Sequence, residues 1–369
     1  MLNFNPDTPL TSQIRVLENA VVVPWGRGKA KRMARPAGVF TAEGQYCHDA
    51  ITYRASTRPT IVEPELPNPD EIRHSLKGTV LFGGIAYGHF GHALCESISR
   101  LWALDAFETP IDKMLFLPKK RMTWPERSLT QIKPMFKSLG DLPPSTAFND
   151  PIRVERLVVA PQGFGVNDMI SGAPEFRDFM DRRWRQRVVA RGPEKLYISR
   201  SEVFRKRGRL LLEEQIEANL KAEGFTIFHP QQHDLQSQLE HYKAAKVIVS
   251  TDNSALHLAA FVADPACKIA ILLRRPGAIY RDFQEQLRRF AGIDPVICAQ
   301  CTKYWFRAGE PVQLNEVISL LDFERTGEML ANSGIVANGH WVNPTQSEID
   351  IALKDFEERG DMLLTEIFV

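Results

Sequence analysis

A histidine and a glutamate four residues apart are the first side chains in this sequence that could do chemistry. His92 and Glu96 lie in the stretch Gly88-His-Phe-Gly-His-Ala-Leu-Cys-Glu-Ser-Ile-Ser-Arg-Leu-Trp102, whose apolar pattern predicts a helix over residues 89–107. Residues at i and i+4 project from one face of a helix, so the two side chains would meet. An imidazole can hold or tune a carboxylate that acts as a general base. A surface ion pair without a catalytic role has the same spacing.

Arginines gather after a predicted strand in the second half of the chain. Residues 195–199 (Lys-Leu-Tyr-Ile-Ser) are typical of a strand. Arg200 would then lie at its carboxyl end, where open α/β sheets bind ligands. Arg205 follows in a loop that carries three more basic residues. Guanidinium groups bind phosphate oxygens in pairs, so this loop could clamp a diphosphate, although an arginine at a strand end is also a common salt-bridge partner.

A strand, a polar turn and a helix follow one another at residues 246–262. The β-branched run at 247–249 predicts the strand, and residues 255–262 predict the helix. The first turn of a helix has unpaired N–H groups and the positive end of the helix dipole, so it favours an anion such as phosphate. A capped crossover helix of any α/β protein has the same pattern. The candidate ligands and caps at this turn are Asp252, Asn253, Ser254 and His257.

Chain length and composition indicate an ordinary globular protein. The chain has 369 residues, enough for two domains, with 44% hydrophobic and 25% charged residues. Lysine and arginine number 46 against 45 acidic residues, so the net charge gives no reason to expect nucleic acid as a partner. No run of 18 apolar residues predicts a membrane span, although peripheral membrane association stays open.

Cysteine usage predicts a reducing compartment. Five cysteines, an odd number in a long chain, favour free thiols and a cytoplasmic protein. Cys298 and Cys301 form one CxxC, but no second pair completes a zinc site, so we expect no metal.

The order of predicted elements indicates an α/β protein with two lobes. Residues 1 to about 75 read as a β-rich N-terminal portion, and strands at 79–83, 114–117 and 154–160 alternate with helices. Four strands separated by helices follow between residues 195 and 273, the pattern of a parallel, Rossmann-like sheet. We also expect helices at 314–325 and 347–359. The predicted division is a first lobe at 1–180, a second lobe at 190–330, and a tail at 331–369 that returns to the first lobe.

Three blocks together resemble glycosyltransferase family 61, a group that includes bacterial capsular polysaccharide enzymes. They are the block at 88–102, Leu-Tyr-Ile-Ser-Arg at 196–200, and Val-Ile-Val-Ser-Thr-Asp-Asn-Ser-Ala-Leu-His at 247–257. The blocks occur in the family's order and at similar separations, and the resemblance covers roughly residues 15–305. The chain departs from the family pattern at Asn253, where bacterial members have glycine, and at Asp252, where many have histidine or an aromatic residue.

The resemblance implies a GT-B-like architecture of two Rossmann-like lobes and inverting, metal-independent transfer from a nucleotide sugar. His92 and Glu96 match the histidine and the acid of the family's first motif, and Arg200 matches the arginine of its second. Ser254 and His257 match the third. The implied donor is a nucleotide sugar, taken as UDP-linked, the acceptor is a glycan or glycoconjugate, and no cofactor is needed. The chain contains no Asp-x-Asp, which agrees with transfer without a metal.

We therefore predict a glycosyltransferase that works on a surface polysaccharide or glycoconjugate. Glu96, tuned by His92, would deprotonate the acceptor hydroxyl, and Arg200, Arg205 and the turn at Ser254 would stabilise the departing diphosphate. One alternative is a non-catalytic, glycosyltransferase-like binding subunit of a polysaccharide assembly complex. A different α/β enzyme of phosphate esters or dinucleotides is disfavoured because the chain has no GxGxxG or GxxxxGK[ST] motif.

Overall fold

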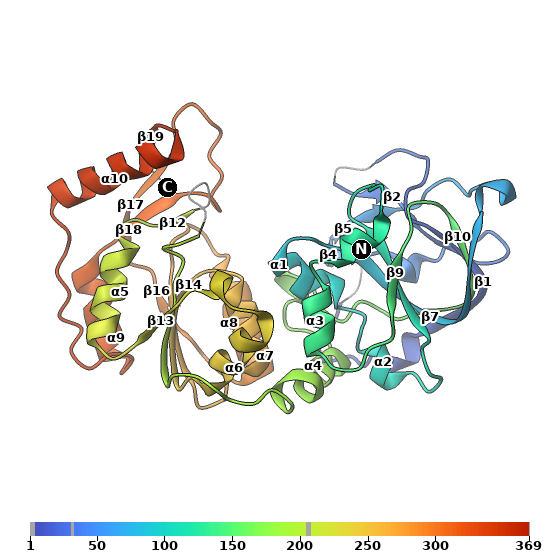
Figure 1. The fold of residues 1–369 in the computed structure, drawn as a ribbon, viewed down its shortest axis with the longest axis horizontal. Helices are drawn as coiled ribbons and strands as arrows, with labels where there is room; N and C mark the ends of the chain where they lie inside the picture. Colours follow the sequence, from blue (N-terminus) through green and yellow to red (C-terminus); the bar gives the residue numbers. More distant parts are fainter. Residues whose placement is uncertain (1–3, 31–32, 204–207, 369) are drawn as a thin grey trace. The chain divides into compact units, whose positions relative to one another are not determined.

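The chain forms two compact units, each with its own apolar core. The structure is a computed structural model that describes residues 4–30, 33–203 and 208–368. The units are Met1–Arg187 and Val188–Val369 (Figure 1). Both combine helices with sheets that contain parallel strands, which confirms the predicted α/β class.

The first unit is built on a six-stranded mixed sheet in the order β3-β1-β10-β7-β8-β9. Strands β10, β7, β8 and β9 run parallel, whereas β1 runs antiparallel to both of its neighbours. The strands of this sheet are β1 (Arg15–Val23), β3 (Gly38–Phe40), β7 (His74–Ala86), β8 (Lys113–Pro118), β9 (Ser145–Ala147) and β10 (Ile152–Val159). Two short pairs flank it: β2 (Arg35–Pro36) with β6 (Ile61–Val62), and β4 (Tyr53–Ala55) with β5 (Arg58–Pro59). The β-rich portion thus joins the parallel strands in one sheet, so this unit is not a pure Rossmann-like lobe.

Helices in the first unit are short, and the single helix predicted over residues 89–107 is wrong. They are α1 (Phe90–His92), α2 (Ala103–Ala106), α3 (Lys133–Ser138) and α4 (Pro174–Met180). A π-helical turn, Ala93–Ser97, follows α1, and irregular turns separate it from α2. The Ser97 hydroxyl donates to Ile85 O at 2.9 Å and accepts from Tyr87 N–H at 3.0 Å. These contacts tie the segment to the end of β7, and tertiary bonding overrides the helical pattern.

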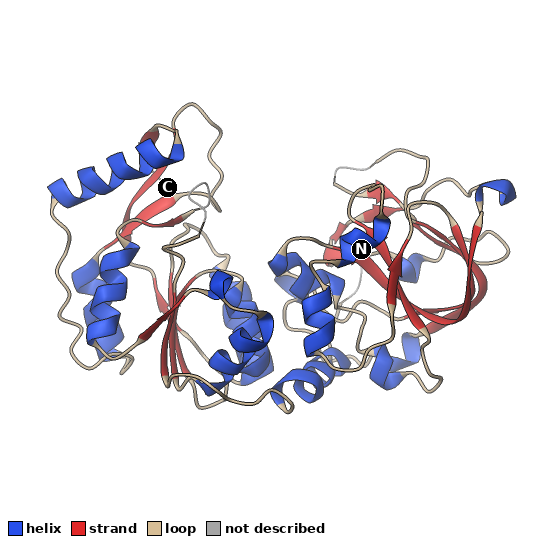
Figure 2. Ribbon diagram, viewed as in Figure 1, coloured by secondary structure: helices blue, strands red, loops and turns tan. Residues whose placement is uncertain are grey.

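The second unit contains the predicted all-parallel sheet, in the order β13-β11-β14-β15-β16. Its strands are β11 (Lys195–Ile198), β13 (Thr226–Phe228), β14 (Val247–Thr251), β15 (Lys268–Leu272) and β16 (Val296–Cys298). The helices are α5 (Glu213–Ala222), α6 (Leu235–Ala244), α7 (Ala255–Val262) and α8 (Tyr280–Ala291). Figure 2 shows helices on both sides of this sheet. Strands covered on both faces read as continuous apolar runs, which explains why the sequence predicted this unit well.

The C-terminal tail completes the second unit. A four-stranded sheet in the order β12-β18-β17-β19 contains β12 (Arg209–Leu210), β17 (Cys301–Arg307), β18 (Ile318–Leu321) and β19 (Leu364–Ile367), and the remaining helices are α9 (Phe323–Asn332) and α10 (Gln346–Gly360). Ile349 and Phe356 of α10 are buried in the core of this unit, and β19 pairs with β17. This corrects the expectation of a tail that returns to the first lobe. The helix predicted at 314–325 is also wrong, because its apolar run forms β18 between β12 and β17.

Candidate active site

In the first unit, the π-helical turn brings Glu96 against His92. His92 Nδ1 lies 2.6 Å from Glu96 Oε1, the distance of a short hydrogen bond in which the ring N–H donates. The Glu96 side chain is only 3% exposed, whereas that of His92 is 35% exposed. π-Helical turns inside helical segments occur frequently at functional sites. The geometry is that of a buried carboxylate oriented by an imidazole that reaches the surface.

Side chains from two other elements surround this carboxylate. Arg54 of β4 places its Nε 3.4 Å from Glu96 Oε1. Lys119 follows β8, and its Nζ lies 5.1 Å from the centroid of the Tyr87 ring. Burial lowers the pKa of Lys119, and the positive charges of Arg35 and Arg54 lower it further. We call His92, Glu96, Arg54, Tyr87 and Lys119 the Glu96 cluster.

The second oxygen of Glu96 is the most informative atom of the cluster. Glu96 Oε2 is buried and accepts no hydrogen bond from the described part of the chain. Burial raises the pKa of the neighbouring Tyr87 hydroxyl, and the negative charge of Glu96 raises it further. Buried polar atoms are nearly always hydrogen-bonded, so a carboxylate oxygen without a donor, beside an imidazole that reaches the surface, is a candidate functional group. This oxygen is suited to accept a proton from a ligand.

In the second unit, Arg200 and Ser254 follow neighbouring parallel strands at the same edge of the sheet. Arg200 comes after β11 and Ser254 after β14, and these strands pair in parallel register. The carboxyl ends of parallel strands are the usual binding edge of such sheets. Ser254 stands at the N-cap of α7, but its side chain makes no capping hydrogen bond. Arg205 lies outside the described residues.

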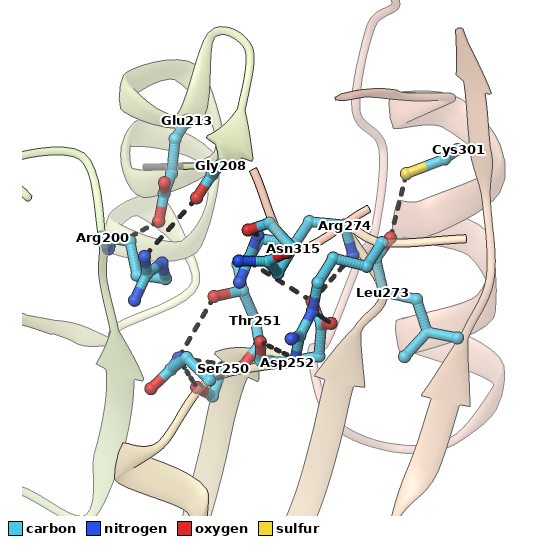
Figure 3. A network of polar contacts seen from close by, with 12 residues as sticks. Arg200, Gly208, Glu213, Ser250, Thr251, Asp252, Leu273, Arg274, Cys301 and Asn315 are labelled. Carbon is cyan, nitrogen blue, oxygen red and sulfur yellow. Dashed lines mark hydrogen bonds and ion pairs between the residues drawn. The ribbon is translucent and has the colours of Figure 1, made fainter. Parts of the chain in front are cut away.

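Asp252 holds two consecutive arginines that follow β15. Its Oδ1 accepts a hydrogen bond from the Arg274 N–H at 3.0 Å and lies 3.6 Å from Arg274 Nε (Figure 3). Arg275 Nε donates to Oδ2, and Arg275 Nη2 donates to Asp252 O at 2.9 Å. Burial lowers the pKa of Arg274 to about 9; the charge of Asp252 opposes this, and those of Arg275 and Arg200 add to it. The guanidinium groups of Arg274 and Arg275 thus share the buried Asp252 carboxylate. We call these two residues and the nearby Arg200 the arginine cluster.

Glu213 positions the backbone of Arg200 from the start of α5. Glu213 Oε1 accepts from the Arg200 N–H at 2.7 Å and from the Tyr197 hydroxyl at 2.9 Å. The carboxyl group is fully buried, and this burial raises its pKa, although its hydrogen bonds and the nearby arginines act in the opposite direction. The Arg200 side chain donates from Nη2 to Gly208 O at 3.4 Å (Figure 3).

The pKa shift of Glu213 predicts a pH-dependent stability. A folded-state pKa raised above the unfolded value gives stability that is present below the unfolded pKa and lost as pH rises through the folded pKa. Glu213→Gln keeps an oxygen acceptor and cannot ionise. We expect the unfolding free energy of the variant, relative to wild type, to increase as the pH rises above about 4 in denaturant titrations. Glu214→Gln is the control, since that side chain is 63% exposed; equal pH trends in both variants would contradict the role of Glu213.

Asn253 and His257 are engaged within the protein. Asn253 Nδ2 donates to Ser250 Oγ at 3.0 Å and to Thr251 O at 2.9 Å, while its Oδ1 accepts from the Ala255 N–H at 2.9 Å. His257 Nδ1 lies 2.6 Å from Gln286 Oε1 of α8. Asn253 therefore shapes the turn before α7, and His257 fixes α7 to α8. Direct contact of Asn253 and His257 with the sugar donor therefore stays a proposal.

Several residues of the two clusters were missed by sequence reasoning. Arg54 and Lys119 come from segments far from Glu96 in the sequence, and no local pattern relates them to it. Arg274 and Arg275 did carry a usable signal, because they directly follow the strand at 268–272 and so lie at the same sheet edge as Arg200.

Two properties of the described residues bear on metal and membrane binding. Among residues 4–30, 33–203 and 208–368, no group of three or more histidine, cysteine, aspartate or glutamate side chains could hold a metal ion. Over the same ranges, every helix is too short or too polar to cross a membrane.

Comparison with known proteins identifies the family. The family model described as glycosyltransferase 61 matches residues 90–270, a span that includes both His92–Glu96 and the Arg200–Asp252 region. No curated protein matches the chain at a significant level. The family match also agrees with the α/β sheets that carry both clusters. The chain belongs to glycosyltransferase family 61.

Proposed function

We propose that this glycosyltransferase moves a sugar from a nucleotide-diphosphate sugar to a hydroxyl group of a glycan or glycoconjugate acceptor, with inversion and without a metal. The observation that carries the proposal is the buried Glu96 carboxylate, which has one oxygen held by His92 and the other without a donor among the described residues. A general base must be oriented and must keep an oxygen for the proton that it accepts.

The first unit supplies the base in this mechanism. The acceptor hydroxyl gives its proton to Glu96, and its oxygen forms a bond to the anomeric carbon of the donor sugar. The bond between that carbon and the diphosphate oxygen breaks at the same time, and the electron pair leaves with the nucleotide. Attack from the face opposite the leaving group inverts the configuration. His92 and Arg54 hold the carboxylate in place.

The second unit supplies charge stabilisation for the leaving group. Arg200, Arg274 and Arg275 gather near the start of α7, where the positive end of the helix dipole also favours an anion. Preorganised positive groups of this kind replace a metal ion in neutralising a diphosphate. We further propose that the two units correspond to the acceptor and donor lobes of a GT-B enzyme. The Rossmann-like sheet of the second unit supports this assignment.

Ligand-induced thermal shifts test donor binding. A ligand that binds only the folded state raises the melting temperature, so a nucleoside diphosphate and its sugars should stabilise the wild-type protein. We expect Arg200→Ala to weaken nucleoside diphosphate binding about tenfold, the loss of one charge-assisted contact, and to leave binding of the bare nucleoside unchanged. UDP, GDP and their sugars are the probes, and Arg281→Ala, an exposed arginine of the same unit, is the control. Equal losses for diphosphate and nucleoside would remove Arg200 from the phosphate site.

A further inference from the structure

A pocket of about 330 Å³ lies in the first unit, apart from the Glu96 cluster. Its walls come from the segment after β1, the residues that precede β7, the loop after β8 and the residues before β10. Among the described residues that line it, Trp25 is the only aromatic one. The charged side chains that line it are Arg27, Arg73, Arg121, Glu65, Glu71 and Asp150.

The charges of the described residues that line this pocket balance, which indicates the kind of ligand that it suits. Three arginines face three carboxylates, and Arg27 is already paired with Glu71 at 2.9 Å and with Glu65 at 3.6 Å. Arg73, Arg121 and Asp150 form no ion pair with any described residue, so two donors and one acceptor group remain for a ligand. A sugar hydroxyl both donates and accepts hydrogen bonds, so mixed guanidinium and carboxylate groups match a neutral saccharide. A polyanionic ligand would be repelled by the three carboxylates that line the pocket.

Trp25 adds an oriented hydrogen-bond donor and an apolar surface. The Arg35 guanidinium lies 4.0 Å from the centroid of the indole and covers one of its faces, which fixes the ring. Trp25 Nε1 is buried and donates to no described group. A buried indole N–H normally has a partner, and a ligand hydroxyl at this wall of the pocket would provide one.

Arg35 connects this pocket to the Glu96 cluster. Its Nη2 donates to Pro118 O at 2.7 Å and its Nη1 to Lys119 O at 3.3 Å, while its guanidinium packs on Trp25. Lys119 belongs to the Glu96 cluster, and Arg121, two residues later in the same loop, lines the pocket. The loop after β8 therefore carries residues of both the pocket and the Glu96 cluster.

We propose that the pocket binds a neutral monosaccharide unit of the acceptor glycan, at a distance from the hydroxyl that reacts. This inference rests on the proposed function, in which the acceptor is a glycan. A glycan longer than one sugar needs a second binding site away from the hydroxyl that reacts. The recognition elements are Trp25, Arg73, Arg121 and Asp150.

Saturation-transfer NMR on the intact two-unit protein tests the pocket. The probes are lactose, cellobiose and mannobiose as neutral saccharides, with glucuronic acid and inorganic phosphate as anionic ones. We expect binding of at least one neutral disaccharide, weakened about tenfold in Arg121→Ala and in Trp25→Ala through the loss of one anchoring contact in each variant. Matched controls come from the same loop: Trp124→Ala and Arg127→Ala remove exposed side chains that do not line the pocket and should bind as wild type does.

The possible results distinguish a failure of the pocket proposal from a failure of the proposed function. Absence of neutral saccharide binding, binding of the anionic probes alone, or equal binding by Arg121→Ala and Arg127→Ala would overturn the proposal. Because Arg121 is exposed and unpaired with described residues, its variant should fold even if Trp25→Ala does not. Nucleoside diphosphate binding is measured on the same samples by thermal shift. Donor binding without saccharide binding refutes the pocket alone, whereas pocket-dependent saccharide binding without donor binding refutes the proposed function.

Discussion

Glu96→Gln is expected to lower kcat by about 10²–10⁴-fold, the usual contribution of a general base. Glutamine has nearly the same shape as glutamate and can still accept the hydrogen bond from His92 Nδ1–H, which is 2.6 Å long in the native pair. It cannot accept a proton from the acceptor hydroxyl. The loss should therefore be in turnover, with donor affinity unchanged, and a transfer assay with a thermal-shift measurement of donor binding separates the two.

A surface glutamate of the same unit provides the control for this experiment. Glu155 is half exposed and lies 3.8 Å from Lys77, so Glu155→Gln should keep full activity. Equal kcat in Glu96→Gln and wild type would exclude Glu96 as the base. A wild-type protein that binds nucleotide sugars and never transfers a sugar would favour a binding subunit of an assembly complex.

The second unit was the more predictable half because its elements are determined locally. The helix predicted at 255–262 is α7 residue for residue, and the strand predicted at 247–249 is the first part of β14. β14 lies in a sheet covered on both faces, where a strand reads as a continuous apolar run, and all eight residues of α7 are buried. The run at residues 317–321 was ambiguous, since a short apolar segment fits a helix or a strand equally well. Its pairing with β17 makes it a strand, and that pairing is invisible in the sequence.

The candidate site was predictable only where its residues share an element. His92 and Glu96 meet because they are four residues apart, and their contact survives even though the predicted helix is a π-helical turn. Arg54 reaches Glu96 from a short strand more than forty residues earlier, through packing that no local pattern describes. Asp252 was predicted as a donor ligand from its place in the turn, but its carboxylate is occupied by Arg274 and Arg275. Its partners follow the neighbouring strand β15, so the interaction depends on the pairing of β14 with β15.

Asp252→Asn is expected to destabilise the second unit by about 3–5 kcal/mol, because it leaves two buried guanidinium groups without their carboxylate. The Asp252 side chain is 1% exposed, and those of Arg274 and Arg275 are 5% and 11% exposed. For a unit of this size the melting temperature should fall by about 10 °C. Asp294→Asn is the matched control: its pair with Arg288 is 2.9 Å long but exposed, so the cost should stay below about 1 kcal/mol. Similar losses in the two variants would mean that Asp252 does not neutralise the arginines.

The same variant links stability to anion binding in the second unit. If the arginine cluster binds the donor diphosphate, an added anion can replace the charge that Asp252→Asn removes. Pyrophosphate should then raise the melting temperature of Asp252→Asn more than that of wild type, because in wild type the carboxylate already offsets part of the positive charge. Arg275→Ala in the Asp252→Asn background should abolish this extra gain. An equal pyrophosphate effect in all three proteins would show that the anion binds elsewhere and that the pair of arginines after β15 serves the fold alone.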